Sequence, residues 1–197
     1  MRWWAFVIAA FVFLVAEVSL RNALTLRFAG NVSPSFVAVL AAYLATFAPR
    51  RAALWACLGL GLLMDLVMPV PDGAVGGGAG PILGANGLGY VFGCLAIVQI
   101  RAMLLRRRAL TLAAMTVLFV IAAGIVTIFV YVVHGWYPSE QPYWSDVRPS
   151  LELLRRLGMA AYSGIAALLI SPVLVWTMPA WGFKGGSGPG WGRGWGR

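Results

Sequence analysis

Charged residues are scarce in this 197-residue chain: Asp, Glu, Lys and Arg make up 11% of it, whereas hydrophobic residues make up 61%. Soluble domains carry about a quarter charged residues, so this chain has too little polar material to cover a surface that faces water. The composition argues against an ordinary cytoplasmic enzyme, a disordered regulator and a nucleic-acid-binding domain. Together with a mean hydropathy of +0.85, it predicts a membrane protein.

Residue types that carry catalysis or bind metals are equally few. The chain has one histidine, His134, and two cysteines, Cys57 and Cys94, neither of which has a second Cys or His at metal-ligand spacing. The sequence contains no H-E-x-x-H, G-x-S-x-G or Walker A motif. We therefore predict that the protein is not an enzyme and holds no metal or cofactor. We expect both cysteines to be small apolar packing residues.

Six hydrophobic segments are present, each close to the roughly 20 residues that cross a bilayer core as a helix. They are Trp3–Leu20, Val32–Ala48, Ala52–Val70, Pro81–Ile100, Leu110–Val133 and Met159–Met178. The second and third are separated by Pro49, Arg50 and Arg51, which predicts a tight hairpin. The first begins with Trp3 and Trp4, which are typical interfacial anchors, and lacks a small-x-small cleavage site, so we expect an uncleaved span.

The distribution of basic residues predicts the orientation of these segments. The net charge is +9, from 15 basic and six acidic residues. With the N-terminus inside, ten Lys and Arg residues fall on cytoplasmic stretches and five on outer loops. We therefore expect a multi-pass protein of the bacterial inner membrane with both termini in the cytoplasm. Its basic residues would face membrane lipid, and no nucleic-acid partner is expected.

The fold class that follows is all-α, a six-helix transmembrane bundle. We expect one transmembrane domain over residues 1–178, followed by a flexible cytoplasmic tail rich in Gly, Trp and Arg over residues 179–197. The stretch from Ser150 to Leu157 has two interpretations. It is either a short helix on the outer membrane surface or the start of the last span, with Ser150 as its N-cap.

Two acidic residues lie inside predicted spans, where an Asp costs about 2.5–3.5 kcal/mol on insertion scales. Glu17 has Arg21 one helical turn above it, in the favourable acid-before-base order, so we expect a structural pair. Asp65 has no such neighbour along its own segment. Its carboxyl is either an ion, proton or partner-binding group, or a hydrogen-bonded contact to a neighbouring helix.

Glycines are concentrated around the fourth segment. Gly84, Gly87, Gly89 and Gly93 place small residues along much of it, and the spacing of Gly89 and Gly93 allows two helices to approach closely. With Asn86, the same glycines are also typical of a broken helix that exposes its backbone to a cavity. Tight packing is the simpler interpretation, and we expect it.

Two stretches that include Asp65 and these glycines form a recognisable pattern, Gly59-Leu-Gly61-Leu-Leu-Met-Asp65-Leu-Val-Met and Leu83-Gly84-Ala-Asn86-Gly87-Leu-Gly89-Tyr90. The last segment adds Tyr162-Ser163 and Ser171-Pro172. The chain thereby resembles the rod shape-determining protein MreD family in its G-L-x-x-D-L segment, its glycine-led next helix, and its Tyr-Thr and Ala-Pro positions. The resemblance covers residues 3–178, and the chain departs from the pattern at residues 72–80 and in its tail.

The resemblance implies a non-enzymatic role in the complex that maintains rod shape. Members of this family partner the bitopic membrane protein MreC, in a complex that couples the actin-like MreB filament to peptidoglycan synthesis by a glycosyltransferase and transpeptidase pair. It also implies a fold similar to the S components of energy-coupling-factor transporters. The candidate structural and partner-binding residues are Glu17, Arg21, Gly61, Asp65, Gly84, Asn86, Gly87, Gly89 and Gly93. The alternative function is a substrate-binding membrane subunit of a transporter for a vitamin-type small molecule.

Overall fold

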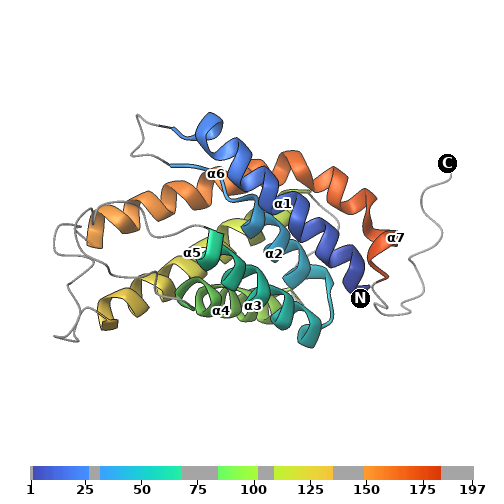
Figure 1. Cartoon of the computed structure of the whole chain (residues 1–197), viewed down its shortest axis with the longest axis horizontal. Helices are drawn as coiled ribbons and strands as arrows, with labels where there is room; N and C mark the ends of the chain where they lie inside the picture. Colours follow the sequence, from blue (N-terminus) through green and yellow to red (C-terminus); the bar gives the residue numbers. More distant parts are fainter. Residues whose placement is uncertain (1, 27–31, 68–83, 102–108, 135–148, 183–197) are drawn as a thin grey trace.

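The computed structural model describes residues 2–26, 32–67, 84–101, 109–134 and 149–182, and the regular structure of these residues is helical (Figure 1). The helices are α1 (Trp3–Leu24), α2 (Phe36–Phe47), α3 (Arg50–Val67), α4 (Ala85–Ile100), α5 (Ala109–His134), α6 (Pro149–Trp176) and the single turn α7 (Met178–Trp181). An isolated bridge joins Leu26 and Val32 in the segment between α1 and α2. The all-α class predicted from the sequence is confirmed for the described residues.

Three of these helices are long and apolar enough to cross a membrane on their own: residues 3–24 of α1, 110–130 of α5 and 153–176 of α6. The other apolar helices are shorter. At 1.5 Å per residue, the 12 residues of α2 extend about 18 Å, which is less than the roughly 30 Å of a hydrocarbon core. In a membrane, a helix of this length would begin or end within the hydrocarbon core.

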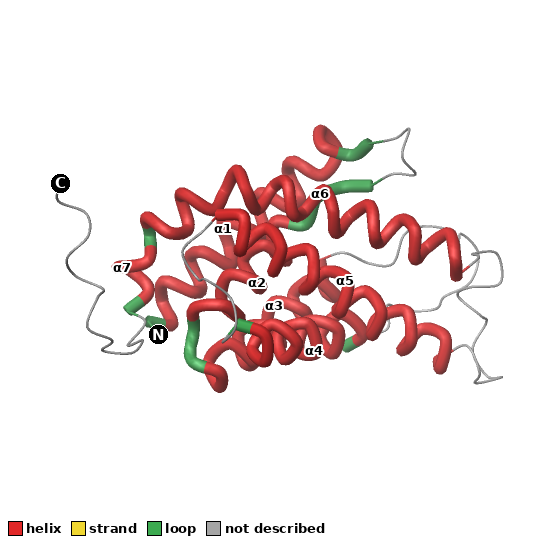
Figure 2. Tube along the Cα trace, turned by 180° about the vertical axis from the view of Figure 1, so that it is seen from behind, coloured by secondary structure: helices red, strands yellow, loops and turns green. Residues whose placement is uncertain are grey.

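The short helix α2 forms the centre of the bundle. Its residues from Val37 to Thr46 are all buried, because α1, α3, α4, α5 and α6 all pack against it. Figure 1 and Figure 2 show α2 in the middle, with α6 on one side of it and α3 and α4 on the other. By contrast, α1 lies at the periphery, and of its residues only Ala5, Ala10 and Glu17 are buried.

Successive helices run in opposite directions, so their ends gather at two ends of the bundle. The start of α1 contacts α7, because the Arg2 backbone N–H donates to the Trp181 carbonyl at 2.9 Å. The start of α3 follows directly on the end of α2, and Arg101 after α4 reaches the same region. Figure 1 shows the start of α1 and the turn α7 at this end of the molecule.

Two predicted segments begin at a different residue from the helices that form. The second was expected from Val32, but the chain is extended up to Ser35, whose hydroxyl accepts from the Ala38 N–H and so starts α2 at Phe36. The last was expected from Met159, but α6 begins ten residues earlier, with a proline at its first helical position. The stretch from Ser150 to Leu157 is thus the start of the last helix rather than a separate surface helix.

The boundary of the expected tail is also wrong. Residues 179–181 were assigned to a flexible tail, but they complete α7, and Trp181 is buried against Tyr43 of α2 with ring centroids 5.6 Å apart. Burial of a large aromatic surface holds this turn against the bundle. Residues 183–197 of the expected tail lie outside the described residues, as does the departure from the family pattern at residues 72–80.

Glycines allow α4 to approach two helices closely. A Cβ added to Gly61 of α3 would come within 2.7 Å of the Gly87 Cα, and one added to Gly89 would come within 2.7 Å of the Ala123 carbonyl oxygen of α5. One added to Gly93 would come within 3.0 Å of the Phe119 side chain. The helix is continuous from Ala85, so the structure agrees with tight packing rather than a broken helix.

A pair of glycines in α3 tests this close approach. We expect Gly61→Ala to lower the free energy of unfolding by about 1–3 kcal/mol, because its methyl group would meet the backbone of α4. Gly59→Ala is the matched control, since an added Cβ there meets nothing within 4 Å and alanine favours a helix by up to about 1 kcal/mol. Thermal unfolding in detergent would compare them, and equal destabilisation by both would contradict this packing.

Candidate functional site

Asp65 lies near the end of α3, and its carboxylate binds the start of α4. Its Oδ2 accepts from the Gly84 N–H at 2.9 Å and the Gly87 N–H at 3.3 Å. Its Oδ1 accepts from the Asn86 N–H at 3.2 Å and from the Asn86 side-chain amide at 2.8 Å. The carboxylate therefore has four donors, from the N-cap residue and the first turn of the neighbouring helix.

This contact replaces a cap that α4 cannot provide for itself. The N-cap residue is Gly84, which has no side chain to accept from the first N–H groups and whose φ of 106° is in the left-handed region that favours glycine. A buried helix start leaves N–H groups unsatisfied and carries a partial positive charge. The Asp65 carboxylate accepts from these N–H groups and supplies the negative charge that this helix end favours. The structure therefore contains the second interpretation of Asp65, a hydrogen-bonded contact to a neighbouring helix.

Gly84 consequently has a different role from the one expected. The sequence placed it among the small residues packed along the fourth helix, but it precedes that helix, and an added Cβ would meet nothing within 4 Å. Its contribution is a backbone conformation that turns its own N–H toward Asp65. Asn86 and Gly87 then contribute their N–H groups at the second and third positions of the helix, which are the usual targets of an N-cap side chain.

Glu17 makes an equivalent contact at the start of α2. Its Oε2 accepts from the Phe36 N–H and, at 3.1 Å, from the Val37 N–H. Ser35 accepts from the next free N–H, that of Ala38, so the first three N–H groups of α2 all have acceptors. Arg21, one turn further along α1, has an electrostatic interaction with the Glu17 carboxylate, but the hydrogen bonds of that carboxylate go to another helix.

The start of α2 lies deep in the bundle and joins four helices. The Ser35 N–H donates to the Ser163 hydroxyl at 2.9 Å, and Ser163 lies in the middle of the 28-residue α6. Tyr90 of α4 lies near enough to Ser35 for a side-chain hydrogen bond. The groups Glu17, Ser35, Tyr90 and Ser163 thus form a polar centre from α1, α2, α4 and α6, in which all four side chains are buried.

Arg101 binds the opposite end of α2. Its Nη1 donates to the Ala45 carbonyl at 3.1 Å and to the Ala48 carbonyl at 2.6 Å. A guanidinium at a helix C-terminus satisfies free carbonyl groups and favours the negative end of the helix dipole. Because α2 has no acidic residue in its first turn and no basic residue in its last turn, Glu17 and Arg101 supply both charges from neighbouring helices.

Sequence reasoning missed the contact of Arg101 with α2, because the basic residues after the fourth segment were assigned to orientation and to the membrane surface. One signal was available: Arg101 follows the apolar run directly, whereas the next basic residue is Arg106. An arginine in that position remains within reach of the bundle end. The contact between Ser35 and Ser163 was missed as well, since it joins residues 128 positions apart in the sequence.

The predicted candidates therefore fall into separate groups. Gly61, Asp65, Gly84, Asn86 and Gly87 come together at the contact between α3 and α4. Gly89 and Gly93 lie on the face of α4 that contacts α5. Glu17 contacts the start of α2 through the N–H groups of Phe36 and Val37, and Arg21 interacts electrostatically with the Glu17 carboxylate.

The two cysteines also lie between helices. Cys57 of α3 and Cys94 of α4 are both buried, their thiols are hydrogen-bonding neighbours, and the Cys57 thiol donates to the Ala41 carbonyl of α2 at 3.7 Å. Among the residues that the structure describes, no group of three or more His, Cys, Asp or Glu side chains has the arrangement of a metal site. The chemistry that this arrangement performs is the satisfaction of buried helix ends.

Substitutions of Asp65 measure its contribution. We expect Asp65→Leu to lower the free energy of unfolding by about 3 kcal/mol or more, because each buried N–H left without an acceptor costs about 1–3 kcal/mol. Asp65→Asn should cost less, since its amide oxygen can still accept. Leu66→Ala is the control, because Leu66 is exposed on the same turn. Equal stability of the Leu and Asn variants in detergent unfolding would contradict this role.

Arg101 is tested in the same way. Arg101→Met removes the charged donor from the end of α2, and we expect a loss of about 1.5–3 kcal/mol, the usual value of hydrogen bonds to charged groups. Arg101→Lys should lose less, because it keeps the charge. Arg51→Met is the control for loss of a basic residue, since Arg51 is exposed at the same end. If both Met variants unfold at the same temperature, the contact does not stabilise α2.

Comparisons with known proteins found no match, so a functional proposal has to rest on the contacts described above. No family model matches this chain, and neither does any curated protein or solved structure.

Proposed function

We propose that this chain is a non-enzymatic, multi-pass protein of the bacterial inner membrane that acts as a scaffold in the cell-elongation complex. Its direct partner would be an MreC-like bitopic membrane protein, which connects it with MreB-like filaments and the peptidoglycan-synthesising pair. The helices α1 to α6 would all lie within the membrane, with both termini in the cytoplasm. The short helices α2 and α4 would be accommodated because neighbouring helices cap their buried ends.

One observation carries this proposal: several residues in which the chain resembles the MreD family join its helices. Asp65 binds Gly84, Asn86 and Gly87, and Ser163 accepts from the backbone of Ser35. A pattern made of such contacts specifies an architecture. It favours a protein that presents a fixed surface over one that turns over a substrate.

The surface available to a single partner helix is the outer face of α1. This helix packs mainly on α2, and its apolar side chains Val7, Phe11 and Val18 are exposed. In a membrane, association of helices relies on close packing rather than on the hydrophobic effect, so a rigid support behind α1 is an advantage. The contact between Glu17 and α2 supplies that support.

The alternative function, a substrate-binding subunit of a vitamin-type transporter, has one feature in its favour. The polar centre around Glu17, Ser35 and Tyr90 lies at a helix start inside the bundle, and transporters place substrates at such points. However, Glu17 and Ser35 already accept hydrogen bonds from the backbone of α2. A ligand would have to displace contacts on which the fold depends, so we favour the scaffold.

Depletion and co-purification test the proposal. In a rod-shaped host, depletion should give rounded cells, and the tagged chain should retain an MreC-like protein from detergent-solubilised membranes. Asp65→Asn should largely keep this partner, whereas Asp65→Leu should lose much of it because α4 is no longer held against α3. Normal cell shape after clean deletion would refute the proposal. A thermal shift with candidate vitamins, together with normal shape, would favour the transporter instead.

A further inference from the structure

One end of the bundle carries exposed tryptophans on three different helices. Trp3 and Trp4 begin α1, Trp55 lies in the second turn of α3, and Trp176 ends α6. Their side chains are 51%, 58%, 68% and 82% exposed, respectively. Trp181 at the same end is buried. A tryptophan at this end is therefore not exposed merely because it lies there, and the other four are exposed because of their individual positions.

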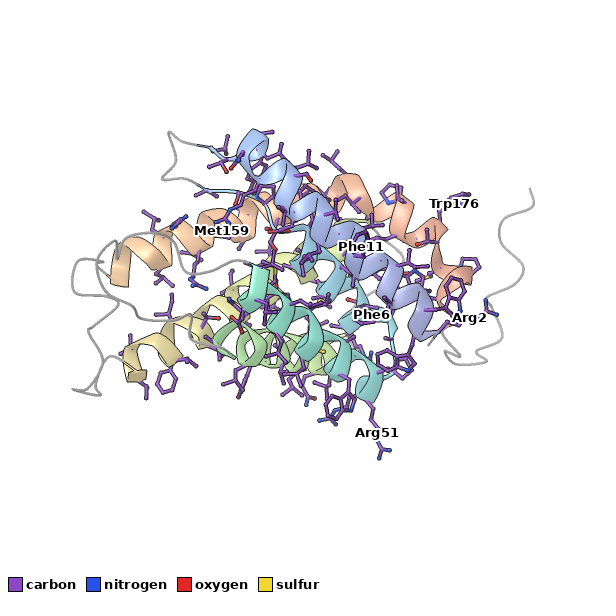
Figure 3. All side chains as sticks on the ribbon, in the orientation of Figure 1. Arg2, Phe6, Phe11, Arg51, Met159 and Trp176 are labelled. Atoms are coloured by element: carbon purple, nitrogen blue, oxygen red, sulfur yellow. The ribbon has the colours of Figure 1, made fainter. Side chains whose placement is uncertain are left out.

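Exposed arginines lie among these tryptophans. Arg2 precedes α1, and Arg50 and Arg51 begin α3; all three are exposed. Figure 3 shows Trp176, Arg2 and Arg51 spread along this end of the molecule. The six acidic residues of the chain are all elsewhere in the sequence, at Glu17, Asp65, Asp72, Glu140, Asp146 and Glu152. The three arginines lie in residues 1–16 and 49–64, and these two stretches contain no acidic residue.

The distribution of these residues distinguishes two kinds of partner. The helices α6 and α3 lie on opposite sides of α2 in both views (Figure 1, Figure 2). The tryptophans therefore surround the bundle axis and do not form a patch on one side of it. A docked protein covers a patch, whereas a lipid leaflet encloses the whole circumference. Tryptophan also prefers the headgroup level of a membrane, where its ring meets lipid and its N–H meets water.

We infer that this end is a binding surface for anionic phospholipids of the surrounding leaflet, formed by Trp3, Trp4, Trp55, Trp176, Arg2, Arg50 and Arg51. The arginines bind the phosphate groups of the lipid, and the tryptophan rings pack on the adjoining glycerol and acyl region. This inference requires only that the chain lies in a membrane. It therefore stands or fails separately from the proposed scaffold role.

Competition between lipids tests the charged part of this surface. The purified full chain is incubated in detergent with equal amounts of phosphatidylglycerol and phosphatidylcholine, and bound lipids are counted by native mass spectrometry. We expect an excess of phosphatidylglycerol that decreases as salt is raised. Each arginine near an anionic surface contributes about fivefold in binding, so the triple variant Arg2→Gln, Arg50→Gln, Arg51→Gln should reduce the excess about tenfold or more.

The matched control keeps the charges at the same positions. The triple variant Arg2→Lys, Arg50→Lys, Arg51→Lys should retain most of the excess, and circular dichroism should give the same helix content for all three proteins. Equal retention of both lipids by the wild type overturns the inference, as does an unchanged excess in the Gln variant. Loss of a co-purifying acidic protein, with lipid preference unchanged, would identify a protein-docking surface instead and would also overturn it.

Quenching of tryptophan fluorescence tests the aromatic part. The chain is reconstituted into phosphatidylglycerol vesicles that carry a nitroxide either at the headgroup or at the end of the acyl chain. The emission of Trp55 and Trp176 is the difference between the wild type and the double variant Trp55→Phe, Trp176→Phe. We expect the headgroup nitroxide to quench this difference more strongly than the chain-end nitroxide does. Emission that neither nitroxide quenches, or that the chain-end nitroxide quenches more, would place these residues away from the headgroup level and overturn the inference.

Discussion

The fold depends on two carboxylates that hold the starts of two buried helices. Water is not available inside a bundle of apolar helices, so the first N–H groups of α2 and α4 require acceptors from the protein. Glu17 and Asp65 supply them from the preceding helix in the chain. Each contact also lowers the cost of burying a charge, because a carboxylate that accepts several N–H groups at a positive helix end is well solvated by them.

The same constraint explains why α2 can be both short and central. A 12-residue helix that is buried on every side has free groups at both ends, and the side chain that it offers locally to its first N–H groups is Ser35. Glu17 at one end and Arg101 at the other complete the set with charges of the signs that a helix dipole favours. The remaining helices can then pack around an element whose two ends are bound by charged side chains.

The sequence was a good guide to the helices and a partial guide to their contacts. Apolar runs and a proline at position 49 predicted the order of the helices, because these signals are local. An acidic residue inside a span is costly, which marked Glu17 and Asp65 as important. Their role as hydrogen-bond acceptors was not predicted, because it depends on helix starts that lie 19 and more residues away. Arg101 was missed for the same reason, since its partners precede it by more than 50 residues.

The division between fixed and free parts of the molecule has a functional consequence. The polar and glycine contacts lie on inner faces, where α4 meets α3 and α5 and where α2 meets its neighbours. They leave α1 as the helix with the least burial, held to α2 at Glu17 and to α7 at Arg2. A helix that is fixed at two points and apolar between them keeps its orientation while its outer face is free. In the proposed scaffold role, that combination would suit recognition by another membrane helix, because a preorganised surface loses little conformational entropy when the partner binds.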